Sequence, residues 1–226
     1  MTCRTSITPW PEYLAAALLA ALALTGCGNR AVGPVVSQQR GVDAFHSIEL
    51  RGSASVEVVA GAPASLMLSA SQSVLGDVTT VVHNGVLVID HETRWYAFGS
   101  HDNLQLRIAT PQLNAFTVSG AGDVKIDAGT GEALAIVLSG AGQIRASGAR
   151  QSLNARINGA GNMDLSQLRV VDATLYVNGA GNLQTLVTGS LKAEVNGVGS
   201  IRYAGNPAQV EPSIHGVGSI GPATSP

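Results

Sequence analysis

The sequence predicts an all-β fold of the parallel β-helix, or solenoid, type from three observations. A motif with two glycines recurs through the second half of the chain at intervals of 18 to 20 residues. Apolar residues stand at fixed distances on both sides of this motif. Glycine is abundant, with 27 residues, whereas only 12% of residues are charged and 4% are aromatic. Because an ordinary soluble domain has about 25% charged residues, this composition favours closely stacked strands of small and aliphatic residues.

The recurring motif is Ser/Asn/His-Gly-Ala/Val-Gly, and we interpret it as a corner that repeats in every coil. Such a corner must admit the same turn with a neighbour above and below it, so that a Cβ would clash or strain the backbone. Asn158, Asn178 and Asn196 fit this interpretation, because Asn tolerates the left-handed conformation and its amides can form ladders. The paired corner glycines are Gly120 and Gly122, Gly140 and Gly142, Gly159 and Gly161, Gly179 and Gly181, Gly197 and Gly199, and Gly216 and Gly218.

The flanks of the motif alternate between apolar and polar residues, which is typical of half-buried strands. Coils stacked roughly 4.8 Å apart would align the apolar positions into one core. The sequence therefore predicts about six regular coils over residues 116–221, right-handed by the chirality rules for parallel connections. The column two residues before the first glycine is Val118, Leu138, Ile157, Val177, Val195 and Ile214. The column four residues after it is Val124, Ile144, Met163, Leu183, Ile201 and Ile220.

Residues 41–115 are rich in β-forming residues but less regular, and we interpret them as continuing or capping the solenoid, whose ends need atypical coils. Asn84-Gly85 between two apolar runs predicts a hairpin with a type I′ turn. The segment Gly52-Ser53-Ala54-Ser55-Val56 is a degenerate echo of the corner, with Val56 at the same offset as in the repeats.

Residues 1–26 read as a lipoprotein signal peptide. An apolar run of mostly Ala and Leu covers residues 13–24, and it is shorter than the roughly 20 apolar residues that a membrane-spanning helix needs. The run ends in Leu24-Thr25-Gly26-Cys27, which resembles a lipobox, so Cys27 would become the lipidated first residue of the mature chain. The alternative is an ordinary signal peptide with a chance cysteine.

Residues 27–40 are predicted to be the lipidated cysteine and a flexible tether, because they are polar, contain Gly and Pro and lack periodicity. The folded domain would then cover residues 41–222, followed by a tail at 223–226. Gly28 stands where an Asp would favour retention in the inner membrane of many Gram-negative bacteria, so its presence favours the outer membrane.

Several sequence segments together resemble the putative auto-transporter adhesin, head GIN domain family. They are the opening Phe45-His46-Ser47-Ile48, the strand end Ala109-Thr110-Pro111-Gln112-Leu113, the successive corners and the close Ile201-Arg202-Tyr203-Ala204-Gly205-Asn206-Pro207. The resemblance covers about residues 41–220 and implies an exported or lipoprotein chain with a β-helical fold. It implies no catalytic or binding residues. His215, Val198 and Val217 depart from the pattern in the last corners and mark the expected end of the stack.

Several function classes lack support in the sequence. A net charge of −2 gives no electrostatic argument for nucleic acid. A nucleotide-binding glycine loop is excluded, because a predicted strand follows each corner where that loop needs a helix. Only one of the residues after the second glycines, Asp123, is acidic, whereas calcium needs several carboxylates. We therefore expect no cofactor, no metal and no nucleic-acid partner.

One dense polar and aromatic cluster lies at residues 90–102, between two predicted strands. Histidines and carboxylates can bind a metal, and aromatic rings can stack on a sugar. The alternative is a long hairpin loop whose rings cover the edge of the solenoid. The candidate ligand residues are Asp90, His91, Glu92, Trp95, Tyr96 and His101.

Together these patterns favour a non-catalytic, lipid-anchored protein of the cell envelope whose solenoid surface binds a glycan or an envelope protein, as an adhesin does. A carbohydrate-active enzyme or glycan-binding protein that uses the loop at 90–102 is the alternative, since some polysaccharide-cleaving enzymes are β-helices. A third hypothesis is that the chain is a structural or stress-related protein of the periplasm. No catalytic residue is predicted, because the outward column is chemically mixed and reads as a solvated face: Lys125, Arg145, Asp164, Gln184 and Arg202.

Overall fold

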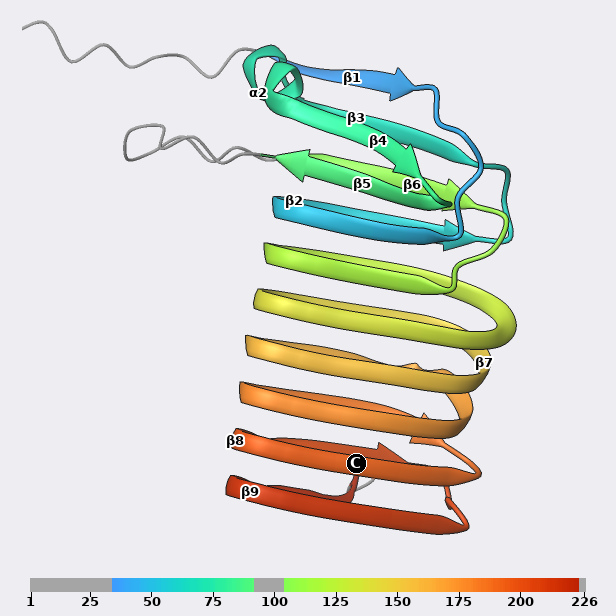
Figure 1. The fold of residues 1–226 in the computed structure, drawn as a ribbon, viewed down its shortest axis with the longest axis vertical. Helices are drawn as coiled ribbons and strands as arrows, with labels where there is room; N and C mark the ends of the chain where they lie inside the picture. The colour runs from blue at the N-terminus through green and yellow to red at the C-terminus, as the bar shows by residue number, and fades with distance from the viewer. Residues whose placement is uncertain (1–33, 92–103, 224–226) are drawn as a thin grey trace, which may run out of the picture. The chain divides into compact units, whose positions relative to one another are not determined.

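The computed structural model describes residues 34–91 and 104–223, which belong to one compact unit, Gly33–Pro226. They form one open β-sheet and a single short helix, so the predicted all-β class is confirmed (Figure 1). Over these residues, no helical stretch has the length and apolarity needed to cross a membrane. The elements are β1 (Val35–Arg40), β2 (Ser47–Ala60), β3 (Ser65–Ser71), α2 (Gln72–Asp77), β4 (Val78–His83), β5 (Val86–His91), β6 (Gln105–Thr110), β7 (Ala115–Val187), β8 (Ser190–Ala204) and β9 (Gln209–Pro222).

The parallel strands pair at equivalent positions of the repeat. Strand β7 passes through four corners and winds back to lie against itself, while β8 pairs with β7 so that Gly179 aligns with Gly197. In the same way β9 pairs with β8, and Gly197 aligns with Gly216. Parallel pairing in register, which the spacing of the motif predicts, is therefore confirmed for these strands. We call each corner with its two flanking strands a layer (Figure 1).

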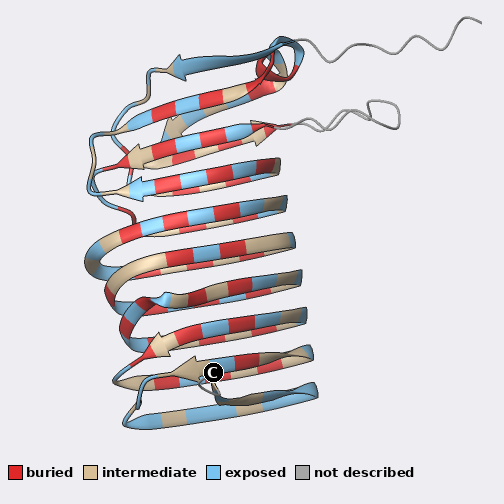
Figure 2. Cartoon of the chain, turned by 180° about the vertical axis from the view of Figure 1, so that it is seen from behind, coloured by how far each residue is buried: buried red, intermediate tan, exposed pale blue. Residues whose placement is uncertain are grey.

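The two apolar columns of the repeat lie inside the layers. From the corner at Gly120 to the corner at Gly197, every member of both columns is at most 3% exposed. Figure 2 shows the result as alternating buried and exposed bands along each strand. Burial of one such Val, Leu or Ile side chain stabilises the fold by about 1.5–3 kcal/mol, so the columns supply the main apolar stabilisation of the stack.

Strand β2 forms a layer of the same kind at the start of the regular stack. It pairs in parallel with β7, and the register aligns Gly52 with Gly120 and Val56 with Val124. The degenerate echo of the corner predicted at residues 52–56 is therefore confirmed. Ala54 replaces the second glycine, and the carbonyl oxygen of Ala54 lies only 2.1 Å from where a Cβ on Gly122 would stand, so its partner in the next layer must remain glycine.

Beyond β2 the pairing becomes partly antiparallel and covers the N-terminal end of the sheet. Strands β5 and β6 both pair with β2 in parallel, one on each side of the corner position. Strands β4 and β3 then pair with them in antiparallel fashion. The hairpin between β4 and β5 is the predicted one, with positive φ angles at Asn84 (51°) and Gly85 (74°) as a type I′ turn requires. This half thus continues the β-sheet and covers its N-terminal end.

The folded unit begins earlier than the predicted tether boundary at residue 40. Val35–Arg40 forms β1, which pairs with β3 at the far end of the sheet. Five of its six side chains are exposed, so the strand lacks the alternation by which a buried strand is recognised. Its side chain at Arg40 donates hydrogen bonds to the carbonyl oxygens of Val78 (2.6 Å) and Leu75 (2.8 Å), which fixes β1 and α2 to the cap.

A buried threonine joins two loops where the cap meets the regular layers. The hydroxyl of Thr110, at 0% exposure, donates to the carbonyl oxygen of Phe45 at 2.5 Å and also lies 3.0 Å from the carbonyl oxygen of Gln112. Buried carbonyl groups need such partners, because an unsatisfied one costs about 1–3 kcal/mol. The hydroxyl thus connects the segment before β2 to the segment after β6.

We expect Thr110→Val to lower the free energy of unfolding by about 1–3 kcal/mol, because the side chain keeps its shape while the buried carbonyl group of Phe45 loses its donor. Urea unfolding followed by circular dichroism measures this change. Thr117→Val, on the outward side of β7, is the matched control and should change stability by less than about 0.5 kcal/mol. Equal effects of the two substitutions would contradict the role of the Thr110 hydroxyl.

Candidate functional site

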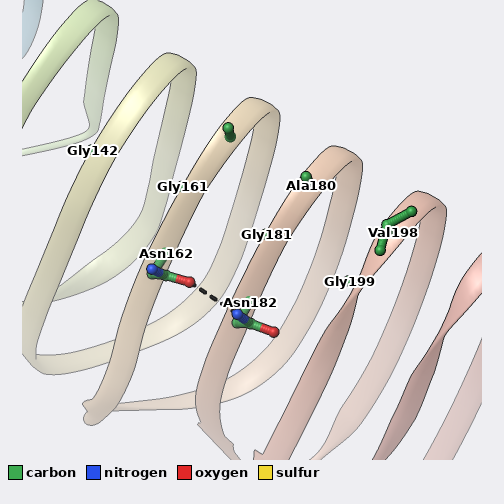
Figure 3. Close-up of a pocket in the computed structure, with 9 residues that line it drawn as sticks. Gly142, Gly161, Asn162, Ala180, Gly181, Asn182, Val198 and Gly199 are labelled. Carbon is green, nitrogen blue, oxygen red and sulfur yellow. Dashed lines mark hydrogen bonds between the residues drawn. The ribbon is translucent and has the colours of Figure 1, made fainter.

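The corners of successive layers form one continuous strip, which we call the corner edge. It consists of the corner motifs and the residue that follows each, from residues 119–123 to residues 215–219. The strip combines corner glycines and apolar tip residues with polar residues on both flanks, and Figure 3 shows the part of it between Gly142 and Gly199.

The backbone of each corner lies against the backbone of the corner below it. A Cβ on Gly179 would stand 2.3 Å from the carbonyl oxygen of Gly159, and Gly179 has a φ angle of 125°. A Cβ on Gly181 would stand 2.3 Å from the carbonyl oxygen of Gly161. The predicted role of the corner glycines is confirmed at these positions, because any side chain would push two layers apart.

Asn side chains on one flank of the corner edge form a hydrogen-bonded ladder. The amide of Asn178 donates to Oδ1 of Asn158 at 2.9 Å, and the amide of Asn196 donates to Oδ1 of Asn178 at 3.1 Å. Asn196 also donates to the carboxylate of Glu194 at 2.6 Å. The predicted amide ladder is confirmed. The expectation of left-handed Asn is wrong, because Asn84 is the one non-glycine residue with positive φ among the described residues, and the adjacent glycines absorb the turn.

A second ladder, on the other flank, was not predicted. The amide of Asn182 donates to Oδ1 of Asn162 at 3.1 Å, and the hydroxyl of Ser200 donates to Oδ1 of Asn182 at 2.7 Å. Figure 3 shows the first of these bonds running between two layers. The signal for this ladder is present in the sequence, since the residue after the second glycine is polar in every corner.

A shallow depression of about 560 Å³ lies over the corner edge, between Gly142 and Gly199. Its walls are the second glycines, the Asn162 and Asn182 amides and the tip residues Ala160, Ala180 and Val198. The depression combines neutral amides from two layers and apolar tip residues from three layers with the corner glycines. This chemistry suits contact with an extended polar chain laid along the stack, and it supplies no group for acid–base catalysis.

The predicted ligand loop is only partly described. Glu92, Trp95, Tyr96 and His101 lie outside the described residues. His91 is 3% exposed, and its Nδ1 lies 3.4 Å from the carbonyl oxygen of Ser53. Asp90 is half-buried and pairs in register with Arg51, whose own carboxylate partner is Glu49 at 2.8 Å. The ligand-binding role of this loop stays a prediction.

The topology places the ends of this loop at the corner position of their layer. His91 ends β5 beside Gly52, since a Cβ on Gly52 would stand 2.3 Å from its carbonyl oxygen. On the other side, the carbonyl oxygen of Leu104 accepts a hydrogen bond of 2.9 Å from the N–H of Ser55. In this layer β5 therefore ends, and the segment before β6 begins, at the position that the Gly-x-Gly corner occupies in the regular layers.

The outward column beside the core is spread along the stack as predicted. Lys125 aligns with Glu57, which in turn lies 3.5 Å from Arg107. Arg145 donates to Gln143 at 3.0 Å, and Asp164 accepts from the hydroxyl of Ser166 at 2.6 Å. Arg145 and Asp164 thus have partners two residues away on their own strand, which agrees with a solvated face.

Titratable groups do not converge elsewhere in the described chain. Within residues 34–91 and 104–223, no three His, Cys, Asp or Glu side chains are placed so that they could hold a metal ion. Two hydrogen bonds from Ser190, of its hydroxyl (2.5 Å) and its N–H (2.9 Å), lower the pKa of Asp172, which shapes an exposed turn. Burial lowers the pKa of the Arg150 guanidinium, which donates to the carbonyl oxygen of Ala128 and packs against Gly131.

The family model of the putative auto-transporter adhesin, head GIN domain matches residues 44–207. The chain belongs to this family. The match spans the layers from β2 to β8, without β9, and includes both the Thr110 contact to Phe45 and the corner edge up to Gly199. The family description of the head GIN domain is that of an adhesin and not of an enzyme.

Solved structures extend the comparison at the level of the fold. The head GIN domain is similar to a putative adhesin from Bacteroides fragilis, with a TM-score of 0.67, 21% identity, and coverage of 84% of this chain and 97% of that chain. It is also similar to a putative lipid binding protein from Parabacteroides distasonis, with a TM-score of 0.49, 18% identity, and coverage of 85% and 98%. No curated protein matches the chain.

We expect Gly179→Ala to lower the free energy of unfolding by at least about 2 kcal/mol, because the new Cβ meets the Gly159 carbonyl and the φ angle is strained for an L-residue. Chemical denaturation measures the change. Gly41→Ala is the matched control, since a Cβ there meets nothing within 4 Å, and it should leave stability unchanged or slightly raised. A small effect at Gly179 would mean that the corners do not fix the distance between layers.

Proposed function

We propose that this chain is a non-catalytic, lipid-anchored protein of the cell envelope that presents a right-handed β-solenoid of about six regular coils as a binding surface. The proposal rests on membership of a family that is described as a putative auto-transporter adhesin, together with the segment Leu24-Thr25-Gly26-Cys27, which resembles a lipobox. The right-handedness of the solenoid is inferred from the chirality rule for parallel connections. The number of coils is inferred from the in-register repeats.

The domain organisation that supports this function has four parts. Residues 1–26 would be removed as a signal peptide, and Cys27 would carry the lipid. Multiple acyl chains give stable anchoring where a single chain gives only marginal binding. The tether would be shorter than residues 27–40, since β1 begins at Val35. The folded domain follows up to about residue 222, and residues 223–226 form the tail. Gly28, in place of an Asp, supports the outer membrane as the anchor site.

The corner edge is the surface that we propose for contact with an envelope partner, a glycan or a protein. Its first ladder repeats a neutral amide over three layers and its second ladder over two, with a spacing of roughly 4.8 Å between layers. Their bonds to one another hold the side chains in fixed positions, so little conformational entropy would be lost on binding. A regular array of this kind favours an extended ligand over a compact one.

We expect the protein to be cleaved when intact cells that express the full-length chain are treated with an external protease, because an adhesin must face outward. Immunoblotting of the domain, with a periplasmic protein as the integrity control, measures the cleavage. The Cys27→Ser variant should lose lipid labelling and should no longer be retained at the surface.

Protection from protease until the outer membrane is opened would overturn the adhesin role and redirect the search to partners in the periplasm. Lipid labelling that survives Cys27→Ser would overturn the anchor instead. The two results are independent. The labelling tests whether Cys27 carries the lipid, and the protease treatment tests on which side of the outer membrane the domain lies.

A further inference from the structure

Strand β9 is the last strand of the sheet, and one of its edges has no partner within the described chain. Its inward positions are less buried than those of the layers before it, since Ile220 is only partly buried and Ile214 is exposed. Ile214 is 44% exposed, whereas its column neighbours Val195 and Val177 are 0% exposed. Val217, at the tip of the last corner, is 75% exposed, and Val198 beside it is 61% exposed. Figure 2 shows this layer as the most exposed of the stack.

The two ends of the sheet are built differently. At the N-terminal end, β1, α2 and β4 cover the layers, and the side chain of Arg40 ties them together. At the C-terminal end, β9 runs for 14 residues without a bulge in its pairing to β8. Natural edge strands are usually protected by Lys, by charges or by covering segments, because a long flat edge recruits another strand. Residues 212–222 contain no Asp, Glu, Lys or Arg.

The residues of this edge are symmetric in chemistry about Val217. Glycines lie one position away on both sides, and isoleucines lie three positions away, at Ile214 and Ile220. Prolines lie five positions away, at Pro212 and Pro222. A two-fold rotation about Val217 therefore places each inward position of one strand opposite an inward position of its copy. A strand with this pattern is complementary to its own copy in the antiparallel direction.

We propose that β9 is the docking surface for β9 of a second copy of this chain, in an antiparallel pair related by a two-fold axis at Val217. The axis passes through the corner, so the strand before the corner of one copy lies on the strand after the corner of the other. Ile214 then contacts Ile220 of the second copy, and the reverse contact follows by symmetry. Such an interface is isologous and closes at two chains.

The prolines set the limits of the pairing. Proline has no N–H to donate to a sheet ladder, so it is tolerated at the ends of an edge and interrupts pairing there. Pro212 of one copy faces Pro222 of the other under the same axis, which leaves residues 213–221 free to pair. Residues 213–221 of the two copies can therefore pair with one another, and the prolines prevent pairing beyond them. The pairing consequently does not extend into a longer aggregate.

The partner is assigned by charge as well as by shape. With no Asp, Glu, Lys or Arg between the prolines, no like charges oppose one another when the same surface meets itself. The exposed Ile and Val side chains gain burial only if the added layer continues the inward columns. A second β9 supplies inward isoleucines at those positions. Since β1 and β9 lie at opposite ends of the sheet order, the dimer would place the two N-terminal strands at its far ends.

Disulfide trapping tests the axis directly. In the full-length chain with Cys3 and Cys27 replaced by serine, Val217→Cys places two thiols opposite each other, at a Cα separation of about 5 Å that a disulfide can span. Val198→Cys is the matched control, because it is also exposed and lies one layer below Val217. Its two copies would be about 14 Å apart, three strand spacings, which is too far for a disulfide.

Mild oxidation in detergent, with micelles in excess over protein, should yield at least about tenfold more cross-linked dimer for Val217→Cys than for Val198→Cys. Equal cross-linking of the two variants would indicate random collision and overturn the proposed pairing. No cross-linking of either variant would overturn it as well.

Association without any cross-link is tested by sedimentation equilibrium of the same cysteine-free chain. The mass should correspond to two chains, and Val217→Lys should weaken association by at least about tenfold, because the two ammonium groups oppose each other across the axis. Val198→Lys should leave association unchanged, and unfolding curves should show that both variants are folded. A single-chain mass before substitution, or equal loss with Val198→Lys, would contradict the docking of β9 on β9. Neither result depends on the anchor at Cys27.

Discussion

The close approach of backbone to backbone at the corners is the constraint on which the rest of the structure depends. A Cβ on Gly140 would stand 2.0 Å from the carbonyl oxygen of Gly120, and the same holds, within a few tenths of an ångström, from one layer to the next. Strands at this separation can pair only in one register, because a shift by one residue would bring a side chain into the corner. That register aligns the Val, Leu and Ile columns, and the core follows from it.

The same register creates the surface chemistry of the corner edge. Residues at equal offsets from the glycines face the same way in every layer, so Asn158, Asn178 and Asn196 become a ladder, and so do Asn162, Asn182 and Ser200. These groups are neutral and already bonded to one another. Over the described residues the stack therefore offers a repeated array of amides and hydroxyls. This array is the physical basis for the binding role that we propose.

The two ends of the stack show how a repeat is terminated. The N-terminal end changes to antiparallel pairing and adds β1 and α2, whose backbone groups are held by Arg40. The C-terminal end keeps the parallel repeat to its last strand and leaves Ile214 and Val217 exposed. An end of the first kind is complete in one chain. An end of the second kind completes its inward columns only with another strand.

The sequence by itself determined the fold class, the in-register pairing, the buried columns and the need for glycine, because each of these repeats at a fixed offset along the chain. It also predicted the Asn84-Gly85 turn, whose geometry is local. Only the tertiary structure decided the features that depend on distant pairing. β1 has exposed side chains and no period, so its place became visible only through its bonds to β3. The pairing of β5 and β6 with β2 on the two sides of its corner, the burial of His91, and the open edge of β9 likewise depend on which strand lies beside which. The identity of a residue does not by itself specify which strand will lie beside it.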